Sequence, residues 1–192
     1  MGSASSAATP LVAVGEAIRL IRAGGVVAYP TEAVFGIGCD PSDVEAVARV
    51  VAVKGRAADK GLILVAADAR QLGPWLAPLE PAWRSRMDDA WPGPVTFVVP
   101  AARDTPSLVR GGRTTIAVRV SDHPIVRALC EGCGHPLVST SANASGEPAL
   151  REDAAVARAF GDALDGVVAG TTGGRRHPSA IVDVRTGRRL RG

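Results

Sequence analysis

Short runs of β-branched and other apolar residues alternate along the chain with segments whose apolar residues recur at helical spacing. Residues 16–22 show the helical spacing, and residues 25–30 have the pattern of a short buried strand that must end at Pro30. Pro, Ser and Asp at residues 41–43 are typical of a helix start, and that helix is predicted to end near Lys54. By the same criteria the chain continues with predicted strands over residues 62–66, 95–99, 115–120, 136–140, 166–169 and 180–184, and predicted helices over residues 81–90, 123–130 and 152–160.

These strands and helices are interleaved without alternating strictly. This order predicts an α/β (α+β) fold in which helices flank one mixed sheet. A length of 192 residues matches a single domain. We therefore expect a flexible tail over residues 1–10 and one domain over residues 11–192.

The composition is that of an ordinary globular protein. Hydrophobic residues make up 46% of the chain and charged residues 21%, so a substantial core can form and intrinsic disorder is disfavoured. The longest apolar stretches are far shorter than the roughly 20 residues that a membrane span needs. The first ten residues carry neither a positive charge nor an apolar segment of signal-peptide length. We therefore expect a cytoplasmic protein that does not enter a membrane.

The basic residues are more informative in kind than in number. The net charge is +3, and no run of Lys or Arg marks a nucleic-acid-binding arm. Of the 22 Lys and Arg residues, only Lys54 and Lys60 are lysines, and both lie in one short segment. A site that requires a compact, movable charge would keep lysine against such a bias towards arginine. Chance clustering of two residues is the alternative.

Two of the three cysteines, Cys130 and Cys133, form a C-x-x-C pair that resembles half of a zinc site. A structural zinc site takes four thiolate or imidazole ligands, usually from two paired clusters. Besides this pair the chain offers only Cys39 and three scattered histidines. We therefore expect no protein-bound metal and interpret these cysteines as ordinary thiols.

Polar clusters follow three of the predicted strands. They are Thr31-Glu32, residues 119–122 and residues 139–143. Ligands of α/β proteins tend to bind outside the carboxyl ends of strands, so the three clusters predict a single cleft. The signatures G-x-x-x-x-G-K-[ST], G-x-G-x-x-G, G-x-S-x-G and H-E-x-x-H are missing, which disfavours the usual nucleotide and hydrolase folds.

The chemistry of each cluster leaves an alternative open. Lys54, Arg56 and Lys60 suit a polyphosphate, but cations at a helix end also match the helix dipole, and a lysine there would be solvated. Arg119 lies on a mostly apolar strand and needs a buried anion, which is either a substrate carboxylate or a structural partner. The serines and asparagine of residues 139–146 suit phosphate or ribose, or they cap a turn. No nucleophile and base adjoin in the sequence, so nucleotidyl transfer fits better than hydrolysis.

Together these segments resemble the short form of the YrdC-like family. The matching motifs span nearly the whole chain in family order: AYPTEAVFGIGCDP at residues 28–41, the K-x-R of Lys54 and Arg56 with DKGLIL, WPGPVTFV at 91–98, AVRVSDHP at 117–124, PLVSTSANASG at 136–146, and TGG with PSAIVD near the end. The resemblance implies a single domain with a twisted mixed sheet around a deep cleft. It also implies the synthesis of L-threonylcarbamoyl-AMP and pyrophosphate from L-threonine, bicarbonate and ATP, assisted by Mg²⁺.

The same resemblance assigns residues to roles, position by position. Lys54, Arg56, Ser141 and Asn143 correspond to the family's catalytic, nucleotide-binding tetrad. Thr115 and Arg191 correspond to further residues that contact ATP in the family. The residues that contact threonine correspond here to Thr31, Arg119, Ser139 and Ser179. Ala149 stands where the family often has a serine. Partner proteins would then transfer the threonylcarbamoyl group to the tRNA adenosine beside the anticodon.

Two other interpretations compete with this one. A double-stranded RNA or tRNA-binding module, or weak tRNA binding beside catalysis, fits the basic isoelectric point near 9.1. An aromatic content of 4% offers few side chains on which bases would stack. The other alternative is a related enzyme that keeps the cleft but acts on a different substrate.

Overall fold

The computed structural model describes residues 7–55, 57–144 and 146–191. Within these ranges, ten strands form one sheet in the order β1-β8-β2-β3-β7-β4-β6-β5-β9-β10. The strands are β1 (Leu11–Val12), β2 (Val27–Pro30), β3 (Phe35–Gly38), β4 (Ile63–Ala66), β5 (Val95–Pro100), β6 (Thr115–Val120), β7 (Leu137–Ser141), β8 (Gly166–Val168), β9 (Ala180–Asp183) and β10 (Arg189–Arg191).

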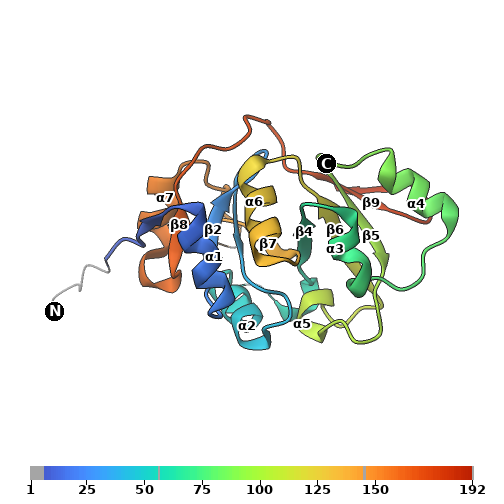
Figure 1. The fold of residues 1–192 in the computed structure, drawn as a ribbon, viewed down its shortest axis with the longest axis horizontal. Coiled ribbons are helices and arrows are strands. Elements are labelled where there is room, and N and C mark those ends of the chain that lie inside the picture. The colour runs from blue at the N-terminus through green and yellow to red at the C-terminus, as the bar shows by residue number, and fades with distance from the viewer. Residues whose placement is uncertain (1–6, 56, 145, 192) are drawn as a thin grey trace.

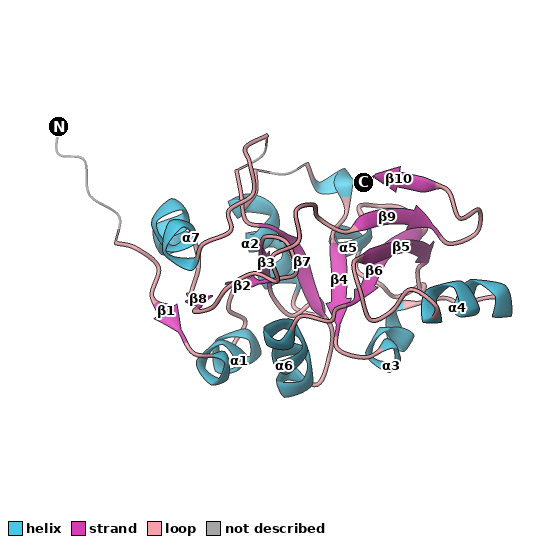
Figure 2. Ribbon diagram, turned by 90° about the horizontal axis from the view of Figure 1, so that it is seen from above, coloured by secondary structure: helices cyan, strands magenta, loops and turns pink. Residues whose placement is uncertain are grey.

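Helices cover the sheet on both faces. Seen from above, α1 and α6 lie on one side of the strands, and α7, α2 and α5 lie on the other (Figures 1 and 2). The buried residues Leu72 of α3 and Met87 of α4 belong to the same apolar cluster as those of α2 and α7. The helix bounds are α1 (Val14–Arg22), α2 (Val44–Val53), α3 (Ala69–Leu72), α4 (Pro81–Asp88), α5 (Ser107–Arg110), α6 (Pro124–Cys133) and α7 (Asp153–Phe160), with single 3₁₀ turns η1 (Ala58–Lys60), η2 (Gly73–Trp75) and η3 (Gly161–Ala163).

The sheet is mixed, as the sequence predicts. β2 pairs in parallel with β8, β4 with β6, and β5 with β9. The pairs β2–β3, β3–β7, β4–β7 and β5–β6 are antiparallel. The prediction of one α/β domain with a mixed sheet is thus confirmed.

Two apolar clusters, one on each face of the sheet, form the core. Val27 and Tyr29 of β2 belong to the cluster that packs under α1 and α6, whereas Val26 and Ala28 belong to the cluster that includes α2 and α7. Residues that alternate along a strand point to opposite faces, so a strand buried on both faces is apolar throughout. This explains why the run over residues 25–30 lacks a polar alternation.

The predicted helix start at Asp43 is confirmed in atomic detail. The Asp43 carboxylate accepts hydrogen bonds from the backbone N–H groups of Glu45 and Ala46, both at 3.0 Å. These bonds satisfy two donors that have no partner within the helix, which is the role of an N-cap residue.

Sequence patterns did not predict β3, which contributes a central strand. Its sequence is Phe-Gly-Ile-Gly, and glycine lowers strand propensity. Gly38 is nevertheless required, because a Cβ atom there would lie 1.8 Å from the carbonyl oxygen of Val138 in the neighbouring β7. A glycine inside a strand can thus mark a close approach of two backbones rather than a turn.

The packed part of the chain begins earlier than residue 11. Thr9 lies within the predicted tail, yet it is buried and its N–H donates to the carbonyl of Ala157 in α7 at 3.0 Å. β1 follows directly and pairs with β8. In the described ranges, none of the helices combines the length and the apolar character that crossing a membrane demands.

Candidate functional site

A cavity of about 460 Å³ opens over one face of the sheet. Thr115, Ala117 and Arg119, which alternate along β6, all line it, as do Ser139 and Ser141 of β7. Residues of neighbouring strands form the floor of the cavity. Gly36 pairs with Ser141, Ile63 pairs with Ser139 and with Ala117, and Ala117 pairs with Val98. Thr115, Ala117 and Arg119 therefore belong to one face of β6, and this face lines the cavity.

The three polar clusters meet in this cavity, but not for the reason that the sequence suggested. β7 runs antiparallel to β4, and β6 runs parallel to β4, so β6 and β7 end at opposite ends of the sheet. Their carboxyl ends therefore do not share an edge. Two of the clusters meet because the turn after β2 carries Glu32 across to the end of β6, where its carboxylate contacts Arg119 and Ser121. The third cluster, residues 139–143, lines the same cavity from β7 and the loop after it.

The loop that follows β7 is held by its own side chains. The Ser141 hydroxyl donates to Asn143 Oδ1 at 2.6 Å, and Asn143 Nδ2 donates to the carbonyls of Ala144 at 2.9 Å and Glu147 at 2.6 Å. Ser141, Asn143, Glu147 and Ala149 also line the cavity. The two interpretations of this loop are therefore compatible, since the same polar groups shape the turn and face the cavity.

Lys54 is not a solvated helix-end lysine, and this expectation is wrong. It caps α2 at its carboxyl end and is only 5% exposed. Its ammonium donates to the carbonyl oxygens of Ser141 and Asn143 and, at 2.7 Å, to Asn143 Oδ1. Lys54 is thus bonded to the tetrad residues Ser141 and Asn143, and these bonds hold the loop after β7 in place. The tetrad residue Arg56 lies outside the described residues.

Arg119 has the structural partner that the sequence left open. It is 7% exposed, and its Nη1 donates to Glu32 Oε2 at 2.8 Å. Ser121 Oγ and the Asp122 N–H also donate to the Glu32 carboxylate, at 2.7 and 3.3 Å. Burial opposes ionisation of Glu32, but the charge of Arg119 and the hydrogen bond from Ser121 outweigh it and hold the pKa of Glu32 below its usual value. The pair is therefore ionised at neutral pH, and Arg119 still lines the cavity.

Three residues with hydroxyl groups line the same cavity as Arg119. Thr31 Oγ1 donates to the carbonyl of Val34 at 2.7 Å, so its oxygen stays able to accept a hydrogen bond from a ligand. Ser179 Oγ lies 2.8 Å from Oγ1 of the fully buried Thr96. Thr31, Ser139 and Ser179 all line the cavity together with Arg119. Thr115 and Arg191 line it as well.

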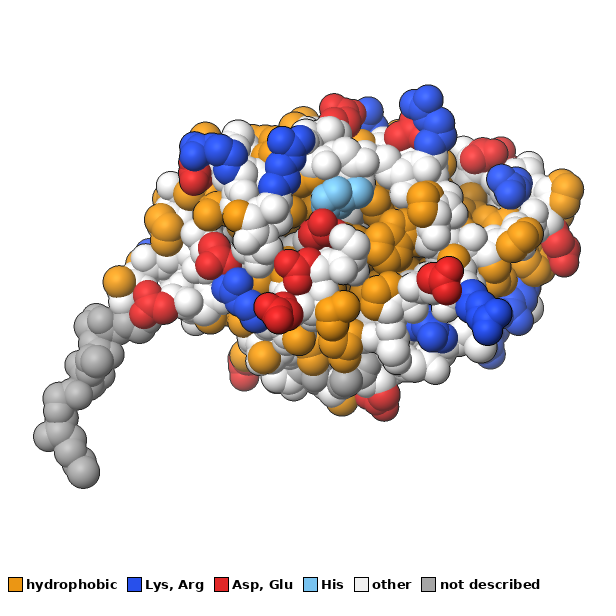
Figure 3. All heavy atoms as spheres, turned by 60° about the horizontal axis from the view of Figure 1, so that its bottom comes forward, with side chains coloured by type: hydrophobic (Ala, Val, Ile, Leu, Met, Phe, Trp, Pro, Cys, Tyr) orange, Lys and Arg blue, Asp and Glu red, His pale blue; other side chains and the backbone are white. Residues whose placement is uncertain are grey.

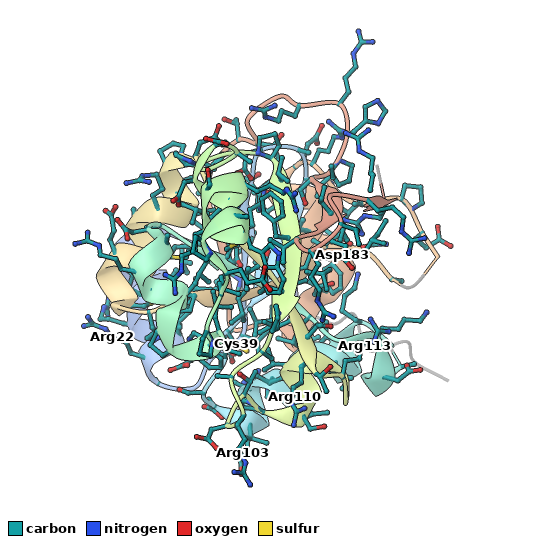
Figure 4. The ribbon with its side chains drawn as sticks, turned by 90° about the vertical axis from the view of Figure 1, so that its right-hand side faces the viewer. Arg22, Cys39, Arg103, Arg110, Arg113 and Asp183 are labelled. Carbon is teal, nitrogen blue, oxygen red and sulfur yellow. The ribbon has the colours of Figure 1, made fainter. Side chains whose placement is uncertain are left out.

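Sequence reasoning missed several basic side chains that line the cavity: Arg110, Arg113, Arg175 and His177. Arg110 and Arg113 lie close together on one side of the molecule, where Arg110 Nη1 donates to the Arg113 carbonyl at 2.7 Å (Figure 4). Between them, Gly111 has φ +63°, and a Cβ there would come within 2.4 Å of the backbone nitrogen of Gly61. The sequence does contain a feature that could have identified these residues. A pair of glycines stands directly beside arginine at residues 110–113 and again at residues 173–176.

The cysteines show no arrangement for a metal. In the described part of the chain, no three His, Cys, Asp or Glu side chains are grouped so that they could hold a metal ion. Cys130 is fully buried in the core, where its thiol donates to the carbonyl of Val65 at 3.4 Å. Burial raises the pKa of Cys130 to about 12, so its thiol is protonated and unreactive at neutral pH.

We expect the double variant Cys130→Ala/Cys133→Ala to keep wild-type activity and to lose about 1 kcal/mol of stability through the small space left at Cys130. Elemental analysis of the purified wild-type protein should find no stoichiometric zinc. Zinc at one equivalent in the wild type that disappears in the double variant would contradict this expectation.

The surface does not present a single basic patch on the face seen in Figure 3, where Lys and Arg side chains are interspersed with Asp and Glu and with hydrophobic side chains. The basic residues that line the cavity are therefore a local concentration of positive charge. Such a concentration attracts an anionic ligand into the cavity more than it attracts a long polyanion to the whole molecule.

Comparison with known proteins relates most of the chain to one family. The model of the Sua5, YciO and YrdC family, described as "Telomere recombination", matches residues 19–191. A protein of Nitrosococcus oceani named threonylcarbamoyl-AMP synthase is 52% identical over 175 residues, which are 91% of this chain and 95% of that protein. A protein of Halorhodospira halophila with the same name is 52% identical over 171 residues, covering 89% and 90% of the two chains.

Solved structures share the fold. P. abyssi Sua5 complexed with L-threonine matches with a TM-score of 0.86 and 32% identity over 92% of this chain. The match covers 52% of the Sua5 chain, so this chain spans about half the length of that protein. E. coli YciO matches with a TM-score of 0.82 and 25% identity, over 93% of this chain and 87% of YciO.

Proposed function

Because the chain belongs to the Sua5, YciO and YrdC family, we propose that its cavity carries out the reaction for which its relatives are named, the synthesis of L-threonylcarbamoyl-AMP. The enzyme is an ATP-dependent nucleotidyltransferase, and its product is the intermediate for threonylcarbamoyladenosine in tRNA. The structural observation that supports this most directly is the convergence of the assigned residues: all of those described, except Lys54, line one cavity.

The reaction requires two steps that need no covalent enzyme intermediate. The amine of threonine takes up carbon dioxide derived from bicarbonate and loses a proton, which gives a carbamate. An oxygen of the carbamate then attacks the α-phosphorus of ATP, the bond to the β-phosphate oxygen breaks, and pyrophosphate leaves. The protein contributes mainly by positioning the two substrates and by stabilising the negative charge on the phosphates.

The nucleotide is proposed to bind at the end of the cavity formed by the β7 loop. Ser141 and Asn143 offer hydroxyl and amide groups there, and Lys54 keeps both in place through its bonds to their carbonyl oxygens. Thr115 and Arg191 are the further ATP contacts that we propose. Arg56 is assigned to the phosphates from the resemblance. Among the residues found in the structure, Arg110 and Arg113 add positive charge to the same cavity, which suits a triphosphate.

The amino acid is proposed to bind at the opposite end, beside Arg119. The guanidinium would hold the threonine carboxylate, and Thr31, Ser139 and Ser179 would receive the hydroxyl and amino groups. In support, Arg119 lines the cavity, and Glu32 accepts from its Nη1 only. A guanidinium carries five N–H donors in a planar fork, so this side chain retains capacity for a further acceptor.

The cofactor and the partners are also proposals. Mg²⁺ would neutralise phosphate charge, and we propose that it arrives with ATP, since the described residues offer no cluster of ligands for it. We propose that threonylcarbamoyl transferase proteins accept the product, that any direct contact with tRNA is weak, and that the protein acts in the cytoplasm, where ATP and tRNA are available.

The decisive experiment is to measure pyrophosphate release with each substrate omitted in turn. We expect release only when L-threonine, bicarbonate and ATP are all present. An enzyme of this fold with another substrate would release pyrophosphate without threonine or not at all, and a purely RNA-binding module would release none. Identification of threonylcarbamoyl-AMP by mass spectrometry completes the test.

The cavity should select threonine by its hydroxyl group rather than by its shape. A site that hydrogen-bonds a hydroxyl rejects an analogue without it more strongly than it rejects the loss of a methyl group, because its own polar groups are left unpaired. We expect serine to lower kcat/KM by about 10- to 200-fold, equivalent to about 1–3 kcal/mol, and valine to lower it further. Values of kcat/KM for the three amino acids decide this. A value for valine equal to or above that for serine would contradict the roles of Thr31, Ser139 and Ser179.

A further inference from the structure

Glu32 stands at the centre of a buried polar network beside the cavity. Its side chain is nearly inaccessible, with 4% of the residue exposed, and it accepts from Arg119 Nη1 at 2.8 Å, from Ser121 Oγ at 2.7 Å and from the Asp122 N–H at 3.3 Å. Arg119 lies near the end of β6, and Ser121 and Asp122 directly follow that strand. The carboxylate therefore ties the turn after β2 to the end of β6.

The backbone of the same turn holds a second segment in place. The Glu32 carbonyl accepts from the N–H of Arg175 at 3.0 Å, and the Thr31 carbonyl accepts from the N–H of Gly173 at 3.0 Å. Gly173 packs so closely that a Cβ atom there would lie 3.1 Å from the Glu32 carbonyl oxygen. The chain then continues to Ser179. The turn that contains Glu32 thus connects the strand of Arg119 with the loop that carries Ser179.

The geometry of the network leaves Arg119 restrained but not saturated. Glu32 occupies Nη1 of the guanidinium, and the buried Nε of Arg119 has no acceptor among the described residues. A long side chain with many rotamers must lose that freedom when it binds a carboxylate in one orientation. Fixing it beforehand lowers the cost of binding.

We infer that Glu32 is the positioning residue that holds Arg119 in the orientation required to bind the amino-acid substrate. This inference rests on the proposed function, since it needs the substrate carboxylate at Arg119. Glu32 itself does not need to touch the substrate, because its effect passes through Arg119. Substitution of Glu32 should therefore weaken the binding of threonine and leave the binding of ATP at the other end of the cavity unchanged.

The chain offers a matched control in the pair of Arg49 and Asp165. These residues also form an ion pair at 2.8 Å, and Asp165 also accepts from a backbone N–H, that of Val26. Both are partly exposed and neither lines the cavity. The variant Asp165→Asn therefore removes a carboxylate–arginine pair without altering the site.

The first test compares steady-state kinetics of Glu32→Gln and Asp165→Asn. For Glu32→Gln we expect the KM for threonine to rise at least tenfold and the KM for ATP to stay within twofold of wild type. For Asp165→Asn both values should stay within twofold. Ser121→Ala, which removes a single hydrogen bond to Glu32, should raise the KM for threonine about threefold and serves if Glu32→Gln does not fold. An unchanged KM for threonine in the folded variants, or an equal rise in both KM values, would overturn the inference.

The second test is a double-mutant cycle with Arg119→Lys, which keeps the charge but loses the planar fork. If Glu32 acts through Arg119, Glu32→Gln should change the KM for threonine less than twofold when Lys already occupies position 119. If the two effects multiply, Glu32 acts on the substrate by another route and the inference fails. Failure of the proposed function is distinguishable, because the wild-type protein would then not consume threonine at all.

Discussion

Replacement of Lys54 with Ala is expected to lower kcat/KM for ATP by at least about 100-fold and to destabilise the protein. The ammonium group joins α2 to the carbonyl oxygens of Ser141 and Asn143 and to the Asn143 amide. Each hydrogen bond to a charged group contributes about 1.5–3 kcal/mol, and the half-buried acceptors left behind would recover only part of this from water. Because Lys54 fixes the loop that we propose to bind the nucleotide, both catalysis and folding depend on it.

A loss of stability is expected because Lys54 is buried; a solvent-exposed lysine would cause none when replaced. We expect the free energy of unfolding to fall by about 2–4 kcal/mol and the melting temperature by about 5–10 °C. Arg49→Ala, on the exposed side of the same helix, should change activity less than twofold. Kinetics at a temperature where Lys54→Ala is still folded, together with a melting curve, check both effects. Activity within twofold of wild type would show that the loop does not need Lys54.

Replacement of Arg119 with Met is expected to abolish measurable use of threonine and to remove about 3–5 kcal/mol of stability at neutral pH. Removing one member of a buried ion pair leaves the other charge buried without a partner. Glu32 is that partner, and it would keep only its hydrogen bonds from Ser121 and Asp122. The exposed pair of Arg49 and Asp165 provides the comparison, since Arg49→Met should cost at most about 1 kcal/mol.

The pH dependence of this effect has a definite sign. In the wild type the pKa of Glu32 is lowered by folding, so the contribution of its ionised form to stability is present above the usual carboxyl pKa and is lost as the pH falls through the lowered value. In Arg119→Met the burial of Glu32 is no longer opposed by the arginine and raises the pKa instead. The variant should therefore gain stability as the pH falls and Glu32 takes up a proton.

Urea unfolding of the wild type and of Arg119→Met between pH 5 and pH 8 tests this directly. We expect the stability difference between the two proteins to shrink as the pH is lowered. Arg119→Lys should lose less stability than Arg119→Met, because it keeps a positive charge near Glu32. It should nevertheless raise the KM for threonine at least tenfold, because a point charge cannot replace a bidentate fork. A stability difference that does not vary with pH would mean that Glu32 remains ionised without Arg119.

The elements with a strong periodic pattern could be predicted, and those shaped by a neighbour could not. β2 and β6 lie in short apolar segments rich in β-branched or aromatic residues, which favour a strand, and the structure contains both. β3 was missed because its two glycines lower strand propensity, whereas its backbone lies too close to β7 for any side chain at Gly38. A constraint that one strand places on another leaves no periodic signal in the sequence of either.

The same distinction holds for the site. The place of Arg119 on an apolar strand predicts that it needs a buried anion. The identity of that anion could not be predicted, because Glu32 lies 87 residues away along the chain. The burial of Lys54 was missed for a similar reason, since its partners belong to a loop nearly 90 residues further on. Local patterns identify which groups need a partner, and only the packing of distant segments determines which partner they find.

The pairing of β9 with β5 determines when the site can form during synthesis. β9 joins β5 in parallel although the paired residues Val95 and Ala180 are far apart in the sequence, and β8 inserts between β1 and β2. Pairings between such distant segments form slowly, and until they form the edges of β2 and β5 lack partners. A nascent chain that has not yet released residue 183 from the ribosome therefore has neither Ser179 in place nor a complete sheet, and it exposes strand edges that favour aggregation. Both ends of the cavity depend on this last part of the chain, because Ser179 directly precedes β9 and Arg191 lies in β10.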